Sequence, residues 1–425
     1  MNSTSRYALL AALGLAVAAV APGTPAVAAK KKEEEGAKAP LKVGNEIRKP
    51  LGEADAAIKK KDVAAAEAAL ATARGLAKTP DEEFAVAQYG LNVAQISGDQ
   101  AKLATALDAL IATGEASGRI DDQQRAQYYW FQGQFAYQAK NYAKAEAALQ
   151  KALAAGSTQA EAYAVLADSQ SRNGKPADAV ATLQKVIDAK AAAGEAVPSE
   201  WYGRGADIAS RAKMPSEFVR ITTAWLNAYP VKQNWHDSLF IYRQLGGLSG
   251  EPDLDMLRLA RAAGVLPLAA ASNYLDYALA IYLKFPNEAV DVLKEGIAAG
   301  KISPSSSQNT REIIALSQPK IAPDKASVPA AVTAANGPKA TYKSVMTTAD
   351  LLYGYKDYAK AAELYKLALT KPGADAGQAN FRLGLALSLA GDKAGAKTAF
   401  DAVTSGPYAA LAAYAKIWSA KPATA

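Results

Sequence analysis

QAKNYAKAEAALQKAL, at residues 138–153, is nearly restated at residues 354–369, which read GYKDYAKAAELYKLAL. Lys, Tyr, Ala, Lys, Ala, Ala and Leu fall at the same offsets in both stretches. Apolar and small residues recur at helical spacing here, and the chain from about residue 46 onward shows almost no strand-like alternation. Restating one helical pattern at distant points is typical of a repeat architecture.

Short breaks separate the helix-length segments, and a fixed pattern follows each break. The breaks are Lys61-Asp62, Gly98-Asp99, Lys140-Asn141, Gly174-Lys175, Lys356-Asp357 and Gly391-Asp392. About four residues later comes a small or apolar residue, and a larger apolar residue follows after four more. Ala145 and Ala179 are 34 residues apart, and Ala361 and Ala396 are 35 apart. We expect two antiparallel helices per unit, in which the small residue allows close approach and the larger one fills the gap to the next unit.

These units resemble tetratricopeptide (TPR) repeats. The resemblance is strongest in residues 126–159, 160–193, 342–375 and 377–410, and looser in 47–80, 84–117, 199–232, 233–266 and 270–303. The first strong unit carries Tyr129, Gly133, Tyr142, Ala145, Leu149 and Ala152 at the signature offsets of the family. Gln132 replaces the usual leucine, and the 233–266 unit has no good small residue in its second helix. The resemblance implies an all-α, right-handed α-solenoid of stacked helical hairpins.

The N-terminus predicts export. A basic residue, a short apolar run and an Ala-x-Ala pattern describe a signal peptide at 1–29, cleaved near Ala28 or Ala29. An uncleaved anchor is the alternative, although the run is short for a membrane span. Residues 30–45 are charged and aperiodic, which predicts a disordered leader. We therefore expect a periplasmic protein with no membrane span in the mature chain.

The remaining chain is expected to form an N-terminal array at 46–303 and a C-terminal TPR pair with a capping helix at 342–425. Between them, 304–341 reads as a Pro-rich linker or long loop, because 317–340 contains four prolines. Residues 406–420 are expected to form the cap, with Tyr414 and Trp418 packing back on the final unit. A partner-docking helix is the alternative for this segment.

Composition limits the possible chemistry. The 425 residues carry a net charge of +7 with Lys and Arg scattered among Asp and Glu, which is weak support for nucleic-acid binding, so we expect none. Cysteine is absent, which excludes disulfides and thiol chemistry.

His236 is the single histidine, followed by Asp237, and no nucleophile motif accompanies it. The stretch 296–303 fails as a phosphate-binding loop in both its glycine spacing and the residue after its lysine. The sequence therefore predicts neither an enzyme, nor a cofactor, nor a metal site.

The TPR resemblance implies a partner-binding concave face lined by the first helix of each unit. Carried onto this chain, the groove residues are Trp130, Gln134, Tyr137, Asp168, Arg172, Asp207, Arg211, His236, Phe240 and Arg243. Arginine can hold a carboxylate with two parallel bonds, and the aromatic rings can take apolar side chains. We expect a non-catalytic scaffold of the bacterial envelope that binds a protein or peptide. The alternative is a module for an envelope glycan or small ligand. The sequence leaves the oligomeric state open.

Overall fold

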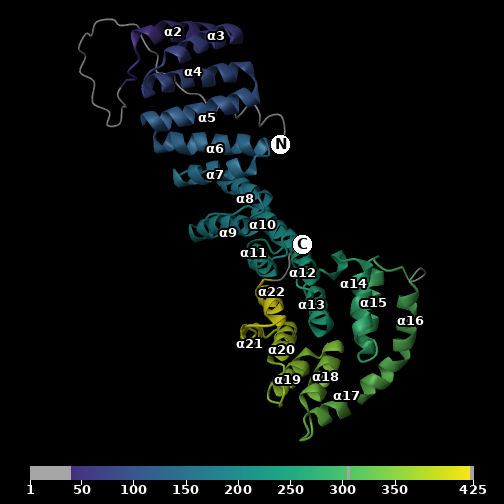
Figure 1. Ribbon diagram of the computed structural model, residues 1–425. Helices are drawn as coiled ribbons and strands as arrows, with labels where there is room; N and C mark the ends of the chain where they lie inside the picture. The colour runs from purple at the N-terminus through teal and green to yellow at the C-terminus, as the bar shows by residue number, and fades with distance from the viewer. Residues whose placement is uncertain (1–39, 304–306, 422–425) are drawn as a thin grey trace. The chain divides into compact units, whose positions relative to one another are not determined.

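The computed structural model describes residues 40–303 and 307–421, and within these ranges the chain forms helices joined by short turns. Consecutive helices pack in pairs (Figure 1), which confirms the all-α fold of stacked helical hairpins. The expected signal peptide at 1–29 and residues 30–39 of the expected leader lie outside the described residues. None of the helices in the described part of the chain combines the length and the apolar character that crossing a bilayer requires.

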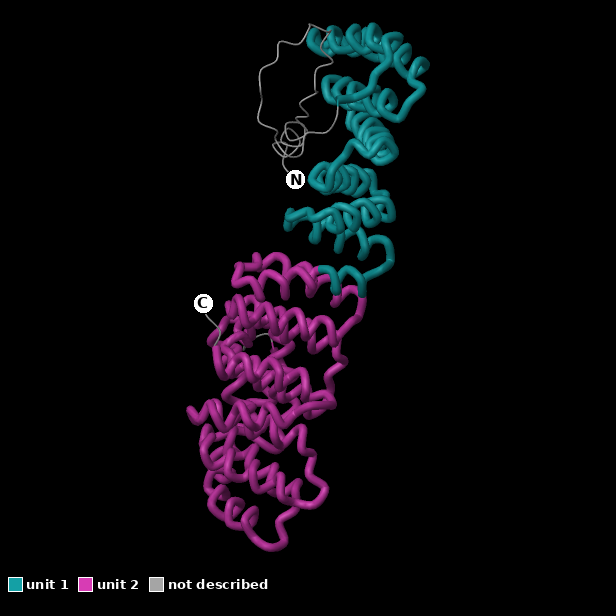
Figure 2. The backbone as a smooth tube through the Cα atoms, turned by 90° about the vertical axis from the view of Figure 1, so that its left-hand side faces the viewer, with its two compact units in different colours: residues 1–182 teal, residues 183–425 magenta. Residues whose placement is uncertain are grey.

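The chain divides into two compact units, unit 1 at residues 1–182 and unit 2 at residues 183–425 (Figure 2). The sequence placed the main break at 304–341 instead. The difference arises because the helices that follow this segment pack onto earlier helices of unit 2, as described below.

Unit 1 is a series of hairpins in which each helix packs mainly on its neighbours in the sequence. Pairs α2–α3, α4–α5 and α6–α7 form the hairpins, and the contacts α3–α4, α5–α6 and α7–α8 stack them. Buried apolar residues, such as Ile47 and Leu70 in one cluster and Leu107 and Leu149 in another, fill the space between the helices. The helices are α2 (Asn45–Lys59), α3 (Val63–Leu76), α4 (Pro80–Ser97), α5 (Gln100–Ser117), α6 (Asp122–Gln138), α7 (Tyr142–Ala154), α8 (Ala160–Arg172) and α9 (Pro176–Ala192), which ends in unit 2.

Unit 2 begins as a similar series, but its last helices return to its first ones. Helices α20 and α22 contact α13, and α22 also contacts α11 (Figure 1). Tyr414 of α22 is buried and its hydroxyl lies 2.6 Å from Thr222 Oγ1 of α11. The expected cap therefore packs on the final hairpin and on α11 and α13 as well. The helices are α10 (Ser199–Arg211), α11 (Pro215–Ala228), α12 (Lys232–Leu245), α13 (Gly250–Ala262), η1 (Leu266–Leu268), α14 (Ala271–Ile281), α15 (Pro286–Ala298), α16 (Gln308–Ser317), η2 (Gln318–Lys320), α17 (Ile321–Ala335), α18 (Tyr342–Gly354), α19 (Tyr358–Leu369), α20 (Ala376–Ala390), α21 (Lys393–Asp401) and α22 (Tyr408–Ala420).

The recurring breaks have a common backbone geometry. The first residue of the break lies in the left-handed region, with φ of 60° at Lys140, 63° at Lys356, 68° at Gly98 and 92° at Gly391. The next residue is the N-cap of the following helix, as at Asn141, whose side chain accepts a backbone N–H from the first turn. A left-handed residue ends one helix and a capping side chain begins the next, which explains the Gly-Asp, Lys-Asn and Lys-Asp pairs.

Glycines in the first helix of a hairpin allow the second helix to approach closely. A Cβ added to Gly133 of α6 would lie 2.6 Å from Leu149 Cγ of α7. One added to Gly384 of α20 would lie 2.4 Å from Phe400 Cε1 of α21. The sequence predicted that Leu149 and Phe400 fill the gap to the next unit, and each also packs on a glycine of its own hairpin. These glycines were not among the small residues that the sequence singled out as allowing close approach.

The expected linker at 304–341 is largely helical, in α16, η2 and α17. Pro319 lies at the start of η2 and Pro323 in the first turn of α17, where a helix needs no N–H donor. Only Pro329 lies inside α17. Tyr355, the C-cap residue of α18, fixes the beginning of α17, because its hydroxyl donates to Asp324 Oδ2 at 2.8 Å. The proline count was misleading because most of these prolines occupy positions that a helix tolerates.

The end of the expected leader, residues 40–44, is attached to unit 1. The backbone N–H of Lys42 donates to Asp81 Oδ2 at 3.0 Å, and that of Gly44 donates to Glu82 Oε1 at 2.9 Å. Both acceptors belong to the first turn of α4, where negative charge is favourable. The hydrogen bond from the Arg119 guanidinium lowers the pKa of Asp81, so this carboxylate stays ionised.

Candidate functional site

The ten predicted groove residues divide equally between the two units. Trp130, the most prominent of them, is a core residue with only 4% of its surface exposed. It belongs to the same apolar cluster as Tyr128, Tyr129 and Phe131, because α6 is covered by α5, α7 and α8. Gln134, one turn later, is half-buried. The prediction that Trp130 offers its ring to a partner is therefore wrong.

Three other predicted residues of unit 1 lie together on α6 and α8. The Tyr137 hydroxyl donates to Asp168 Oδ2 at 3.4 Å, and the Arg172 guanidinium lies 6.0 Å from the centre of the Tyr137 ring. The same guanidinium is 5.5 Å from the ring of Tyr142 on α7. These cation–π contacts hold Arg172 over two rings, so the three predicted residues form one cluster that links three helices.

In unit 2, Asp207 and Arg211 form an ion pair with each other along α10. Both side chains are mostly exposed, with 57% and 73% of their surfaces accessible. Exposed pairs at this spacing contribute little stability. The sequence predicted both as groove residues, and in the structure their charges are paired with each other on an exposed part of α10.

The remaining three predicted residues, His236, Phe240 and Arg243 of α12, line a single cavity of about 630 Å³. They lie at successive turns of α12 and so share one face of the helix. We call this space the α12 cavity. Its other walls come from the turn after α12, from η1 and from α14, and include Gln244, Leu248, Leu268, Asn273 and Asp276.

One wall of the α12 cavity is aromatic and apolar. The His236 and Phe240 rings lie 4.8 Å apart, centre to centre. Leu268 of η1 leaves 41% of its surface exposed, which is high for a leucine. The Nδ1 of His236 lies 3.0 Å from Asp237 Oδ1. The cavity therefore offers an apolar surface that includes two rings tilted toward each other by 35°.

The polar part of the cavity is organised around Arg243. Its Nε and Nη2 donate to Asp253 at 2.6 and 2.7 Å, and Nη1 donates to Asn273 Oδ1 at 2.5 Å. Nη2 also donates to Asp276 Oδ2 at 3.0 Å. These carboxylates, with Asp253 making the largest contribution, raise the pKa of Arg243. Arg243 is held rigidly by residues of α13 and α14 and has little capacity left for a ligand.

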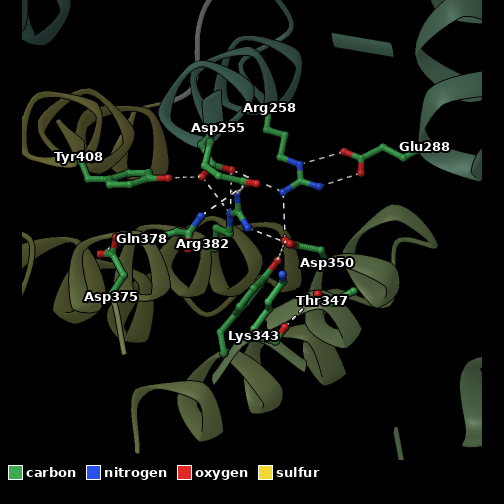
Figure 3. A network of polar contacts seen from close by, with 12 residues as sticks. Asp255, Arg258, Glu288, Lys343, Thr347, Asp350, Asp375, Gln378, Arg382 and Tyr408 are labelled. Atoms are coloured by element: carbon green, nitrogen blue, oxygen red, sulfur yellow. Dashed lines mark hydrogen bonds and ion pairs between the residues drawn. The ribbon is translucent and has the colours of Figure 1, made fainter. Parts of the chain in front are cut away.

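Unit 2 contains a buried ion network that the sequence did not predict (Figure 3). Two arginines hold three carboxylates, and we call the set the α13 network. Arg258 donates to Glu288 at 3.0 and 2.8 Å and to Asp350 at 3.1 Å. Arg382 donates to Asp350 at 2.8 Å and to Asp255 at 2.9 Å. Helices α13, α15, α18 and α20 each contribute at least one member.

Tyrosine hydroxyls complete the α13 network, one at each carboxylate. Tyr277 donates to Glu288 at 2.7 Å, Tyr365 to Asp350 at 2.7 Å and Tyr408 to Asp255 at 2.9 Å. Burial raises the pKa of each of these tyrosines, so they remain protonated donors. Burial likewise raises the pKa of Asp255.

The five charged side chains of the α13 network are each more than nine-tenths buried and bonded to one another. A buried charge is tolerated only when it is paired in this way. We therefore assign the network to the folding of unit 2 and not to ligand binding. A signal was present in the sequence, because Arg258 and Arg382 interrupt apolar stretches, MLRLARA at 256–262 and NFRLGLAL at 380–387.

Within residues 40–303 and 307–421, no group of three or more histidine, aspartate or glutamate side chains is arranged to hold a metal ion. The strongest candidate for binding is therefore the α12 cavity. It is open, it combines an apolar wall with fixed polar groups, and it contains three of the residues that the sequence singled out.

Comparison with known proteins gives little beyond the fold. No family model matches the sequence, and no curated protein matches it. Among solved structures, the TPR domain of P58(IPK) is 15% identical, with 84% of this chain and 92% of that chain covered and a TM-score of 0.21. The structure of Naa15/Naa10 bound to HypK-THB is 12% identical, with 86% and 70% covered and a TM-score of 0.20. TM-scores this low do not establish a shared arrangement of helices, and nothing about function follows from them. By its own geometry, the chain is an all-helical protein built from TPR-like hairpins.

Proposed function

We propose that this protein is a non-catalytic scaffold that binds a protein or peptide partner, and that the α12 cavity is part of its binding surface. The observation that carries the proposal is that His236, Phe240 and Arg243 line one open cavity of about 630 Å³. Ligand sites are typically concave, largely apolar and equipped with a few fixed polar groups. Aromatic and arginine side chains are also the residues on which binding energy concentrates at protein interfaces.

The chemistry of the cavity supports binding better than turnover. His236 is the single histidine of the chain, and its near neighbour Asp237 is an ordinary orienting partner, but no nucleophile motif accompanies the pair. Arg243 is engaged by three side chains, so it is fixed in place and does not reach toward a reacting group. The cavity therefore supplies shape and charge.

Site-specific crosslinking tests the proposal. The photoreactive residue p-benzoylphenylalanine is placed at Phe240 of the full chain, and at Arg211 of α10 as a control in the same unit. After irradiation of an envelope fraction, position 240 should yield a discrete protein adduct that position 211 does not. The adduct should disappear when Leu268→Ser is added to the first variant. Identical adducts at both positions, or none at 240, would show that the α12 cavity is not the working surface.

Binding of an envelope glycan is the alternative, favoured by the polar side chains beside the Phe240 ring. Gln244, Asn273 and Asp276 line the same cavity, and sugars commonly bind to walls of this kind. Digesting the envelope fraction with protease before capture separates the two possibilities. Capture that survives digestion would favour the glycan, whereas loss of capture would favour a protein partner.

The location in the envelope rests on the sequence of residues 1–29 alone. We propose that the chain is exported and processed there. N-terminal sequencing of the protein from a periplasmic extract should begin just after Ala28 or Ala29. A mature protein that retains Met1, or one absent from the extract, would contradict export by a cleaved signal peptide.

A further inference from the structure

We propose that the α12 cavity selects a basic side chain, lysine or arginine, of its partner. The inference rests on the proposed function and specifies the chemistry of the same site. The TPR resemblance suggested that Arg243 would hold a carboxylate of the partner. The contacts of Arg243 indicate instead that the cavity favours a positively charged group.

The guanidinium of Arg243 is already occupied along both of its hydrogen-bonding edges. Asp253 takes Nε and Nη2 at 2.6 and 2.7 Å, which is the two-bond geometry that an incoming carboxylate would need. Asn273 accepts from Nη1 at 2.5 Å. The Arg243 and Asp253 side chains are only 17% and 19% exposed, so this pair is not readily displaced.

The charge left at the cavity is negative. Asp253 alone neutralises Arg243, yet Asp276 also lines the cavity and makes one bond, at 3.0 Å, to the same guanidinium. The Asp276 side chain is 47% exposed and can therefore reach a ligand. A cationic group is the complement to this distribution, and an anionic one would be repelled.

The apolar wall fits the remainder of a basic side chain. Lysine and arginine carry a hydrocarbon stem below the charge, and the stem packs on apolar surface while the head group stays with polar partners. The neighbouring His236 and Phe240 rings and the exposed Leu268 provide that surface. A ring face also attracts a nearby cation. A simple amine without a stem would contact the polar groups of the cavity but not its apolar wall.

The exposed face of α14 extends the site. Leu279 follows Asp276 by three residues, so it shares its face of α14, and 48% of its surface is exposed. Leu283, in the turn after α14, leaves 69% of its surface exposed. We therefore expect an apolar residue of the partner to follow the basic one within a few positions.

His236 provides a direct readout, since a tag-free chain has only one histidine. With histidine labelled by carbon-13, the ring signals of His236 report occupation of the cavity. The probes are three blocked hexapeptides of alanine, with leucine at position five and lysine, norleucine or glutamate at position two. The lysine peptide should shift the ring signals with saturation and bind about fivefold more tightly than the norleucine peptide, as expected for a charge-assisted contact.

Two matched variants test which carboxylate is responsible. Asp276→Asn should remove most of the preference for lysine. Asp207→Asn removes a carboxylate that is also paired with an arginine in unit 2, and it should change nothing. Equal binding of the lysine and glutamate peptides, an unchanged preference in Asp276→Asn, or no shift with any peptide would each overturn the proposal.

The outcome separates this inference from the proposed function. If the crosslinked partner at position 240 is captured equally by wild type and Asp276→Asn, the scaffold stands and the charge selection is wrong. If the lysine peptide binds as described but no protein adduct forms at position 240, the chemistry of the cavity stands and the protein-binding function is wrong.

Discussion

Unit 1 and unit 2 are built from the same helical hairpins but are held together differently. In unit 1 the contacts join helices that are near neighbours in the sequence, and apolar clusters fill the gaps. In unit 2, Asp255 of α13 is bonded to Arg382 of α20 and to Tyr408 of α22, residues 127 and 153 positions away. The comparison teaches that identical local units give a modular stack where contacts are short-range, and a cooperative body where charged side chains join distant units.

The largest effect should come from removing one arginine of the α13 network. Arg382→Met keeps much of the side-chain volume but removes one of the two arginines that neutralise the buried carboxylates Asp255 and Asp350, which should destabilise unit 2 by about 3–5 kcal/mol. Hydrogen exchange followed by mass spectrometry should show faster exchange in α13, α18 and α20, with unit 1 unchanged. The control, Arg211→Met, removes an exposed pair and should cost less than about 1 kcal/mol. Equal loss of protection in both units would contradict the contrast between them.

A smaller effect should follow from removing a single hydroxyl on α22. Tyr408→Phe deletes the donor to the buried Asp255 carboxylate and should cost about 1.5–3 kcal/mol. Tyr414→Phe deletes a bond between neutral groups, to Thr222, and should cost about 0.5–1.5 kcal/mol. Urea unfolding of the two variants measures the difference. If Tyr414→Phe proved the more damaging, charge would not be what fixes α22.

Glycine substitutions compare the hairpin contact in the two units. In Gly384→Ala the added methyl would meet the rigid Phe400 ring at 2.4 Å, whereas in Gly133→Ala it would meet the flexible Leu149 at 2.6 Å. Overpacking costs about 1–3 kcal/mol, of which the better helix propensity of alanine returns about 1 kcal/mol. We expect a clear loss of thermal stability for Gly384→Ala and a near-neutral result for Gly133→Ala. If Gly133→Ala lowered the thermal stability more than Gly384→Ala, the rigidity of the side chain facing the glycine would not determine the cost of the added methyl group.

The smallest effect should be a gain. Lys140, in unit 1, and Lys356, in unit 2, have positive φ at turns where other hairpins of the chain use glycine, as at Gly391. Lys140→Gly and Lys356→Gly should each stabilise the protein by about 0.5–1 kcal/mol, because the strain of the left-handed conformation outweighs the added freedom of the unfolded chain. The reciprocal change, Gly391→Lys, should destabilise it. Differential scanning calorimetry resolves shifts of this size, and a loss of stability in both lysine variants would contradict the role given to the turns.

The hairpins were predictable from the sequence because their determinants are local. Helical spacing, the left-handed turn residue and the glycine that faces a large residue all lie within one 34-residue unit. The closure of unit 2 was not predictable, because no local pattern tells which carboxylate Arg382 pairs with. Trp130 was misplaced for a related reason, since its burial depends on three neighbouring helices and not on its own.

Part of the candidate site could be read from the sequence. Helical spacing alone puts His236, Phe240 and Arg243 on one face of α12, where they line the α12 cavity; their role in binding stays a prediction. The charge preference of the cavity could not be foreseen, because it depends on Asp253 and Asp276, which reach Arg243 from α13 and α14. The sequence identified Arg243 as a candidate binding residue. Only the fold revealed that its guanidinium already donates hydrogen bonds to Asp253, Asn273 and Asp276.

The return of α22 to α11 and α13 has a consequence for how this chain can change over generations. A stack such as unit 1 can gain or lose a hairpin by duplication or deletion, since each new unit meets only its neighbours. Unit 2 has no such freedom. An extra hairpin between α13 and α20 would carry Arg382 away from Asp255, so the number of hairpins there is fixed by geometry. The number of hairpins can therefore change in unit 1 but not in unit 2.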